Sequence, residues 1–131
     1  GTKDATFDVV LSYPSGHLMN PKNLSMGSFK VSVKQNDEQG VYYTYSAGKA
    51  GILTMNVDKV SSKSGTIKAG IVITVTPKNS DIPVQYTLEE GQTTLSIEVK
   101  AGDSVSINIG TLPNEQNRYM AADIEVTASF A

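Results

Sequence analysis

Hydrophobic and polar residues alternate along most of this chain. The clearest run is Phe29, Val31 and Val33, which are separated by Lys30 and Ser32. In a strand, successive side chains point to opposite faces, so such a run has one apolar face and one polar face. The same pattern predicts strands at 7–11, 41–45, 53–57, 71–75, 95–99, 105–109 and 124–130. No window of a dozen residues follows a helical period, so the sequence predicts an all-β chain.

Polar segments that contain glycine separate these runs at short intervals. Two of them are Asn36-Asp37-Glu38-Gln39-Gly40 and Ala101-Gly102-Asp103. Glycine accepts the positive φ that tight turns require, so these segments favour hairpins and short loops. The pattern predicts an antiparallel β-sandwich of about eight or nine strands, either immunoglobulin-like or jelly-roll.

Length and composition narrow the possible functions. The chain of 131 residues fits one sandwich module over 1–131 and contains no cysteine, so a disulfide, a thiolate metal site and a cysteine nucleophile are excluded. Lys and Arg total 11 against 13 for Asp and Glu, a net charge of −2. Such a surface has no long-range attraction for nucleic acid. No apolar run approaches the roughly 20 residues of a membrane span, so we expect no membrane insertion. We also expect the chain to be a monomer.

Residues 5–13 resemble residues 122–130. Alanine, valine and serine are identical at three positions, and the acidic and aromatic positions correspond. One interpretation is that 5–13 is equivalent to the last strand of a preceding tandem copy. The other is that two short alternating strands match by chance.

Several motifs resemble those of a known class of module. They are Asn20-Pro21, Gln39-Gly40-Val41-Tyr42-Tyr43-Thr44-Tyr45, Gly51-Ile52-Leu53-Thr54-Met55, Val99-Lys100-Ala101-Gly102-Asp103 and Ala121-Ala122-Asp123-Ile124. Together they resemble an accessory β-sandwich module, of immunoglobulin-like or carbohydrate-binding type, that is repeated in surface proteins and polysaccharide-degrading enzymes of gut Firmicutes. The resemblance covers about 20–131. It implies an extracellular or cell-surface location and neighbouring domains in the same chain.

Residue types that carry out catalysis are few. His17 is the only histidine, and it lies in a predicted loop without an acidic neighbour. Glu89 and Glu90 are adjacent at a strand end, so their side chains diverge and cannot share a proton. No nucleophile elbow, Walker loop or histidine pair at metal-ligand spacing occurs. We expect a non-catalytic chain, which the resemblance links to larger glycoside hydrolases.

No cofactor is expected. Asp58, Asp81, Asp103 and Asp123 are scattered singly, and no segment concentrates oxygen ligands as an EF-hand loop does. A structural calcium ion, which carbohydrate-binding sandwiches often hold, is the alternative.

Sugar recognition usually combines an aromatic ring with planar polar groups, because the ring stacks on a pyranose and the polar groups bond its hydroxyls. The candidate binding residues are Tyr119, Arg118, Asn117, Gln116, Tyr86, Tyr42 and His17. The loop from Gln116 to Tyr119 is the leading site, with Tyr86 as a second stacking partner. Its alternative is an ordinary polar loop that Tyr119 anchors to the core.

The alternation within 41–45 places Tyr43 and Tyr45 on one face and Tyr42 on the other. If Val41 marks the core side, Tyr43 and Tyr45 are structural and Tyr42 is exposed. For His17, the alternative to a binding role is a solvated or turn-packing histidine.

Two functions remain open. The first is a carbohydrate-binding module that holds a surface enzyme on a polysaccharide or oligosaccharide, with starch or another α-glucan as the first ligand to test. The second is an immunoglobulin-like spacer or adhesion module that binds no ligand of its own. The polar loop with Tyr119 favours the binder, and the absence of tryptophan favours the spacer.

Overall fold

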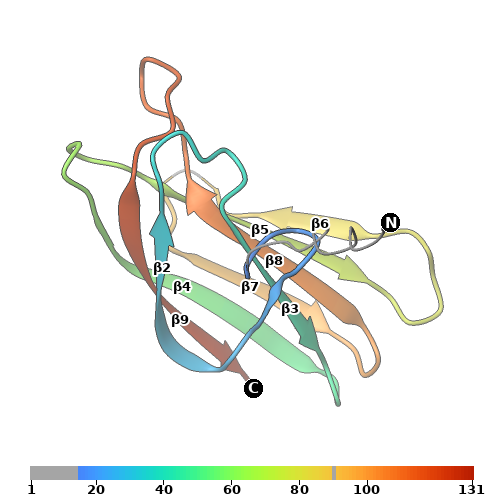
Figure 1. Cartoon of the computed structure of the whole chain (residues 1–131). Coiled ribbons are helices and arrows are strands. Elements are labelled where there is room, and N and C mark those ends of the chain that lie inside the picture. The colour runs from blue at the N-terminus through green and yellow to red at the C-terminus, as the bar shows by residue number, and fades with distance from the viewer. Residues whose placement is uncertain (1–14, 90) are drawn as a thin grey trace, which may run out of the picture.

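Two packed β-sheets make up this protein in a computed structural model that describes residues 15–131 except residue 90 (Figure 1). One sheet has the strand order β1 (Lys22–Asn23), β3 (Val41–Ser46), β8 (Ser104–Thr111), β5 (Ala69–Thr76) and β6 (Val84–Thr87). The other has the order β2 (Gly27–Val33), β9 (Ala122–Phe130), β4 (Gly51–Ser61) and β7 (Thr94–Val99). The predicted all-β sandwich is confirmed. The described part contains no helix that is long and apolar enough to cross a membrane.

The chain changes sheets at almost every connection. From β2 to β9, consecutive strands lie in different sheets except for the β5–β6 hairpin. In an immunoglobulin domain, several consecutive strands are neighbours within one sheet. The observed order is therefore that of a jelly roll, with one additional short strand, β1, at the edge of β3. The β1–β3 pair is parallel, and all the other strand pairs are antiparallel.

The core lies between the two sheets and consists of the apolar positions of the alternating runs. Leu53 and Met55 of β4, Ile107 and Ile109 of β8, and Ile124 of β9 are all fully buried. Their neighbours along each strand point outward, as the period-two pattern requires. The sequence pattern therefore identified the core side of these strands correctly.

Aromatic pairs close the core at β3. Tyr43 is 6% exposed, and its ring centroid lies 5.4 Å from that of Phe29. Tyr45 and Phe130 form a second pair, with 5.7 Å between centroids. Tyr43 and Tyr45 thus face the core and Tyr42 faces outward, as the parity predicted. Phe7 and the strand predicted at 7–11 lie outside the described residues.

Two short strands were not predicted. β6 follows Pro83 and has only four residues, and all four of them are exposed. β1 has two residues and precedes the alternating run at 29–33. Both are edge strands whose pairing partners define them, because each is too short to show a period of its own.

Gly40 allows the β2–β3 loop to lie close to β8. Its φ is 70°, and a Cβ atom at this position would lie 2.5 Å from the carbonyl oxygen of Ile109. Only glycine meets both conditions without strain or displacement. The loop is therefore held against the end of the five-stranded sheet.

Candidate functional site

The loop between β8 and β9 contains four of the predicted binding residues and extends beyond the strand ends (Figure 1). Asn114 organises it. Its Oδ1 accepts hydrogen bonds from the backbone N–H groups of Gln116 and Arg118, both at 3.0 Å. Its own N–H donates to the carbonyl of Arg118, and its carbonyl accepts from the N–H of Asn117, both at 2.9 Å. Asn114 is not among the residues predicted from the sequence, although asparagine in a turn typically bonds through its side chain to the backbone two residues further on.

Asn117 closes this turn with a φ of 62°, a left-handed conformation that asparagine tolerates better than most residues. Arg118 is exposed, and Tyr119 is half-buried. The carbonyl of Tyr119 accepts a 2.7 Å hydrogen bond from the N–H of Asn36, which ties this loop to the β2–β3 loop. Gln116 alone of the four predicted residues lines a hollow, of about 760 Å³, together with Ser64 and Lys68.

Tyr42 and His17 line one hollow of about 300 Å³, although they are distant in the sequence. The backbone N–H of Tyr42 donates to the carbonyl of Gly16 at 2.8 Å, which holds the loop that carries His17 against β3. His17 Nδ1 accepts a 3.0 Å hydrogen bond from the N–H of Met19. One ring nitrogen of His17 therefore supports a local turn, in line with the turn-packing alternative.

Tyr86 does not share a surface with Tyr42. In β6 it lies opposite Ile73, whose side chain is buried, and directly opposite residues of a sheet point to the same face. Tyr86 therefore lies on the inner face at the margin of the sandwich, 37% exposed. Tyr42 points to the outer face from β3, which is separated from β6 by the two strands β8 and β5.

The outer face of the five-stranded sheet carries no charged side chain among its described strand residues; we call it the neutral face. It consists of the cross-strand rows Asn23–Thr44–Ser106–Thr74–Gln85, Tyr42–Asn108–Val72–Thr87 and Ser46–Ser104–Thr76, with Gly70 opposite Gly110. Most of these side chains end in a hydroxyl or an amide. Both groups donate and accept hydrogen bonds.

We call the outer face of the four-stranded sheet the charged face. It differs from the neutral face in its residue types and in the hydrogen bonds between its side chains. It includes Lys30, Asp58, Glu98, Asp123 and Glu125. Its side chains bond to one another: Ser32 donates to Asp123 at 2.9 Å, and Asp58 accepts from Asn56 at 2.6 Å. A surface whose polar groups are already paired offers fewer of them to a ligand.

Polar side chains on the neutral face are mostly unpaired. Within the described part of the chain, the hydroxyls of Thr74, Thr76, Ser104 and Ser106 make no hydrogen bond to protein. These four, with Thr44 and Ser46, line a hollow of about 290 Å³ across β3, β8 and β5. The neutral face thus presents a shallow site with free donors and acceptors and no charge.

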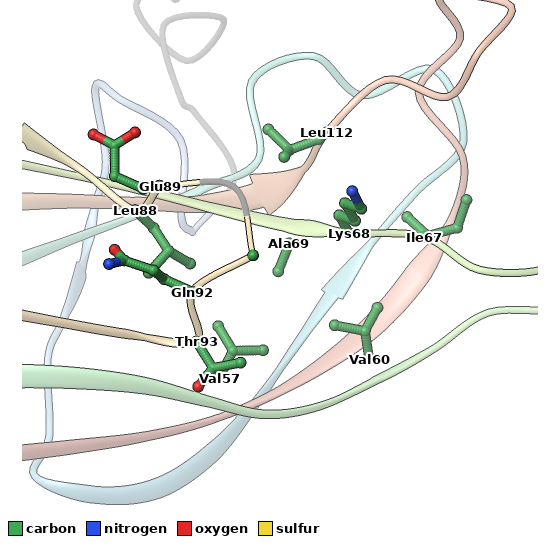
Figure 2. Close-up of a pocket in the computed structure, with 11 residues that line it drawn as sticks. Val57, Val60, Ile67, Lys68, Ala69, Leu88, Glu89, Gln92, Thr93 and Leu112 are labelled. Carbon is green, nitrogen blue, oxygen red and sulfur yellow. The ribbon is translucent and has the colours of Figure 1, made fainter.

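Another pocket, of about 250 Å³, lies between the sheets and is mainly apolar. Figure 2 shows Val57 and Val60 of β4 near Ala69 and Leu88, with the carboxylate of Glu89 directed away from them. Apolar walls supply contact area but few hydrogen bonds. The pocket therefore does not match a hydroxyl-rich ligand.

Carboxylates are dispersed over the described residues. No group of three or more His, Cys, Asp or Glu side chains in that part of the chain is arranged to hold a metal ion. Asp103 is 7% exposed, and its oxygens accept from the backbone N–H groups of Lys100 and Lys78, at 2.9 and 3.4 Å. Its carboxylate connects two loops and has a structural role.

No protein-family model, curated protein or solved structure matches this chain.

Proposed function

We propose that this chain is a non-catalytic carbohydrate-binding module whose ligand lies on the neutral face. The observation that carries the proposal is the contrast between the two outer faces: one is charged and internally hydrogen-bonded, and the other is uncharged with free hydroxyls. Sugar hydroxyls donate and accept hydrogen bonds without charge, so they complement the second face. A charged ligand would find no ionic partner among the side chains of the described strand rows of that face.

Tyr42 supplies the aromatic surface that such a site requires. It is the one aromatic side chain in the described rows of the neutral face, and it lies directly opposite Asn108. The Nδ2 group of Asn108 donates to the carbonyl of Gln39, which fixes the amide beside the ring. A pyranose stacked on Tyr42 would have this amide within reach of its hydroxyls.

The wider setting follows from the same proposal. The module would belong to a secreted or cell-surface protein that degrades polysaccharide, with neighbouring domains in the same chain. Binding by one shallow face would be weak, and tandem copies would strengthen it by raising the effective concentration of sites. Starch is the first polysaccharide to test.

Native gel electrophoresis tests the proposal directly. The purified chain is run in gels that contain starch, pullulan, xylan or mannan, and we expect retardation by at least one of them. Tyr42→Ala should abolish this retardation. Tyr86→Ala is the matched control, because that tyrosine lies on the opposite side of the same sheet and should leave the retardation unchanged.

A spacer without a ligand is the second candidate. The chain has no tryptophan, and Tyr42 alone gives the neutral face an aromatic surface. Mobility that is the same with and without every polysaccharide would favour the spacer over the binder.

A further inference from the structure

The registers of the five-stranded sheet align one polar residue from every strand. Each of these residues lies directly opposite the next one on the neighbouring strand. From β1 through β3, β8 and β5 to β6 they are Asn23, Thr44, Ser106, Thr74 and Gln85. We call this the long row. Neighbouring strands lie about 4.8 Å apart, so the long row extends over about 19 Å.

The hydrogen-bonding groups continue across all five strands, whereas along the central strands β8 and β5 they end within the face. On β8 the outward residues change from Ser104 and Ser106 to Asn108 and then to Gly110. On β5 they change from threonine to Val72 and then to Gly70. A ligand parallel to β8 or β5 would therefore pass from hydroxyls onto bare backbone. A ligand perpendicular to the strands meets one polar side chain at each step.

We propose that the neutral face binds a neutral, extended glycan that runs along the long row, across the strands, and that the row accommodates about four pyranose units. This inference rests on the proposed carbohydrate-binding function and adds the direction, length and charge class of the ligand. The strand spacing is of the order of the length of one pyranose unit, so successive units meet successive side chains.

The hollow on the neutral face coincides with the middle of this path. Thr44, Ser106 and Thr74 form one side of it, and Ser46, Ser104 and Thr76 form the other. A central sugar unit would thus lie between two lines of hydroxyls, while the outer units would meet Asn23 and Gln85. The unit over β3 would also lie beside the ring of Tyr42, which is two residues from Thr44 on the same face. The hydroxyls of the hollow and the ring of Tyr42 should therefore contribute most of the affinity.

The described strand rows of the neutral face lack the cationic side chains that would bind acidic glycans. Recognition of carboxylate or sulfate groups in proteins relies mainly on arginine and lysine. The long row and the two shorter rows contain neither. Polygalacturonate and sulfated glycans should therefore not bind to this face.

Oligosaccharide length is the first test. Malto-, xylo-, manno- and cello-oligosaccharides of two to six units are titrated calorimetrically into the wild-type chain. In the series that binds, affinity should rise by about tenfold or more between two and four units and then level off. A disaccharide that binds as tightly as the hexasaccharide would overturn the long path. Tight binding of polygalacturonate would overturn the neutral class.

Matched substitutions locate the path. Ser106 and Ser96 are both strand serines that lie directly opposite a threonine, Thr74 on the neutral face and Thr54 on the charged face. Ser106→Lys should weaken binding by about tenfold or more, because the long side chain fills the centre of the row. Ser96→Lys should change affinity by less than about twofold, since it lies on the other sheet.

A second variant distinguishes a loss of binding from a loss of folding. Thr74→Val keeps the shape of the side chain and removes its hydroxyl, so it should weaken binding by about threefold to tenfold with an unchanged melting temperature. If polysaccharide retards the chain and both Ser106→Lys and Thr74→Val keep full affinity, the path along the long row is wrong. The proposed carbohydrate-binding function would still stand. A wild-type chain that no polysaccharide retards would overturn both.

Discussion

Thr54 and Ser96 share a hydrogen bond of 2.9 Å between β4 and β7, whereas Thr74 and Ser106, an equally direct pair on β5 and β8, share none. The two pairs have the same residue types and the same cross-strand relationship. Their difference reflects the two outer faces as a whole. On the charged face many polar side chains bond to one another, and on the neutral face most of them, with Asn23, Thr44 and Asn108 as exceptions, make no bond within the described part of the protein.

This relationship predicts different costs for the same substitution. Ser96→Ala removes a cross-strand hydrogen bond and should lower the free energy of unfolding by about 0.2–1 kcal/mol. Ser106→Ala removes no bond within the protein and should leave that free energy nearly unchanged. Urea unfolding of the two variants measures the difference. A larger loss for Ser106→Ala would show that its hydroxyl is bonded within the protein.

Core packing predicts a contrast between two adjacent residues of β4. Leu53 is fully buried, and Ile52 is 47% exposed on the charged face. Leu53→Ala should lower the free energy of unfolding by about 2–5 kcal/mol, because it leaves a cavity between the sheets. Ile52→Ala should cost less than about 1 kcal/mol. Equal costs, measured by urea unfolding, would contradict the assignment of faces.

The hydrogen bonds of the Asp103 carboxylate predict that its removal destabilises the protein, although Asp103 is not part of the apolar core. Asp103→Ala removes the acceptor for the backbone N–H groups of Lys100 and Lys78 and should cost about 1–3 kcal/mol. Asp103→Asn keeps one side-chain oxygen and should recover part of that loss. Asp81→Ala is the control, since Asp81 is exposed in the nearby β5–β6 loop and should cost less than about 0.5 kcal/mol. Thermal melts that rank Asp81→Ala as the most harmful variant would refute this role.

The burial of the Tyr43 phenol predicts a loss of folding stability at alkaline pH. Burial raises the pKa of its phenol above the ordinary value of 10.0. Between the unfolded and the folded pKa the unfolded chain binds fewer protons than the folded chain, so stability falls as the pH rises above about 10. Tyr43→Phe should show a shallower fall in urea unfolding from about pH 8 to about pH 11. Parallel pH profiles for the wild type and this variant would rule out the contribution of Tyr43.

Local sequence determined the strands and their faces. The alternation in Phe29-Lys30-Val31-Ser32-Val33 predicted both β2 and its core side. The parity of Val41 to Tyr45 placed Tyr43 and Tyr45 on the same face as Val41, which is the core side in the structure. These predictions succeed because the orientation of a side chain in a strand depends only on its position relative to its neighbours. The four residues of β6 are too few for this argument.

Tertiary structure alone decided which strands are neighbours, and with it the jelly-roll order and the composition of each outer face. Thr44, Ser106 and Thr74 lie far apart in the chain and are indistinguishable in pattern from Thr54 and Ser96. Only the strand registers align the first three in one uncharged row and place the other two on the face that carries Glu98 and Asp123. Pairing between distant strands depends on how the whole core packs, which a local period does not encode.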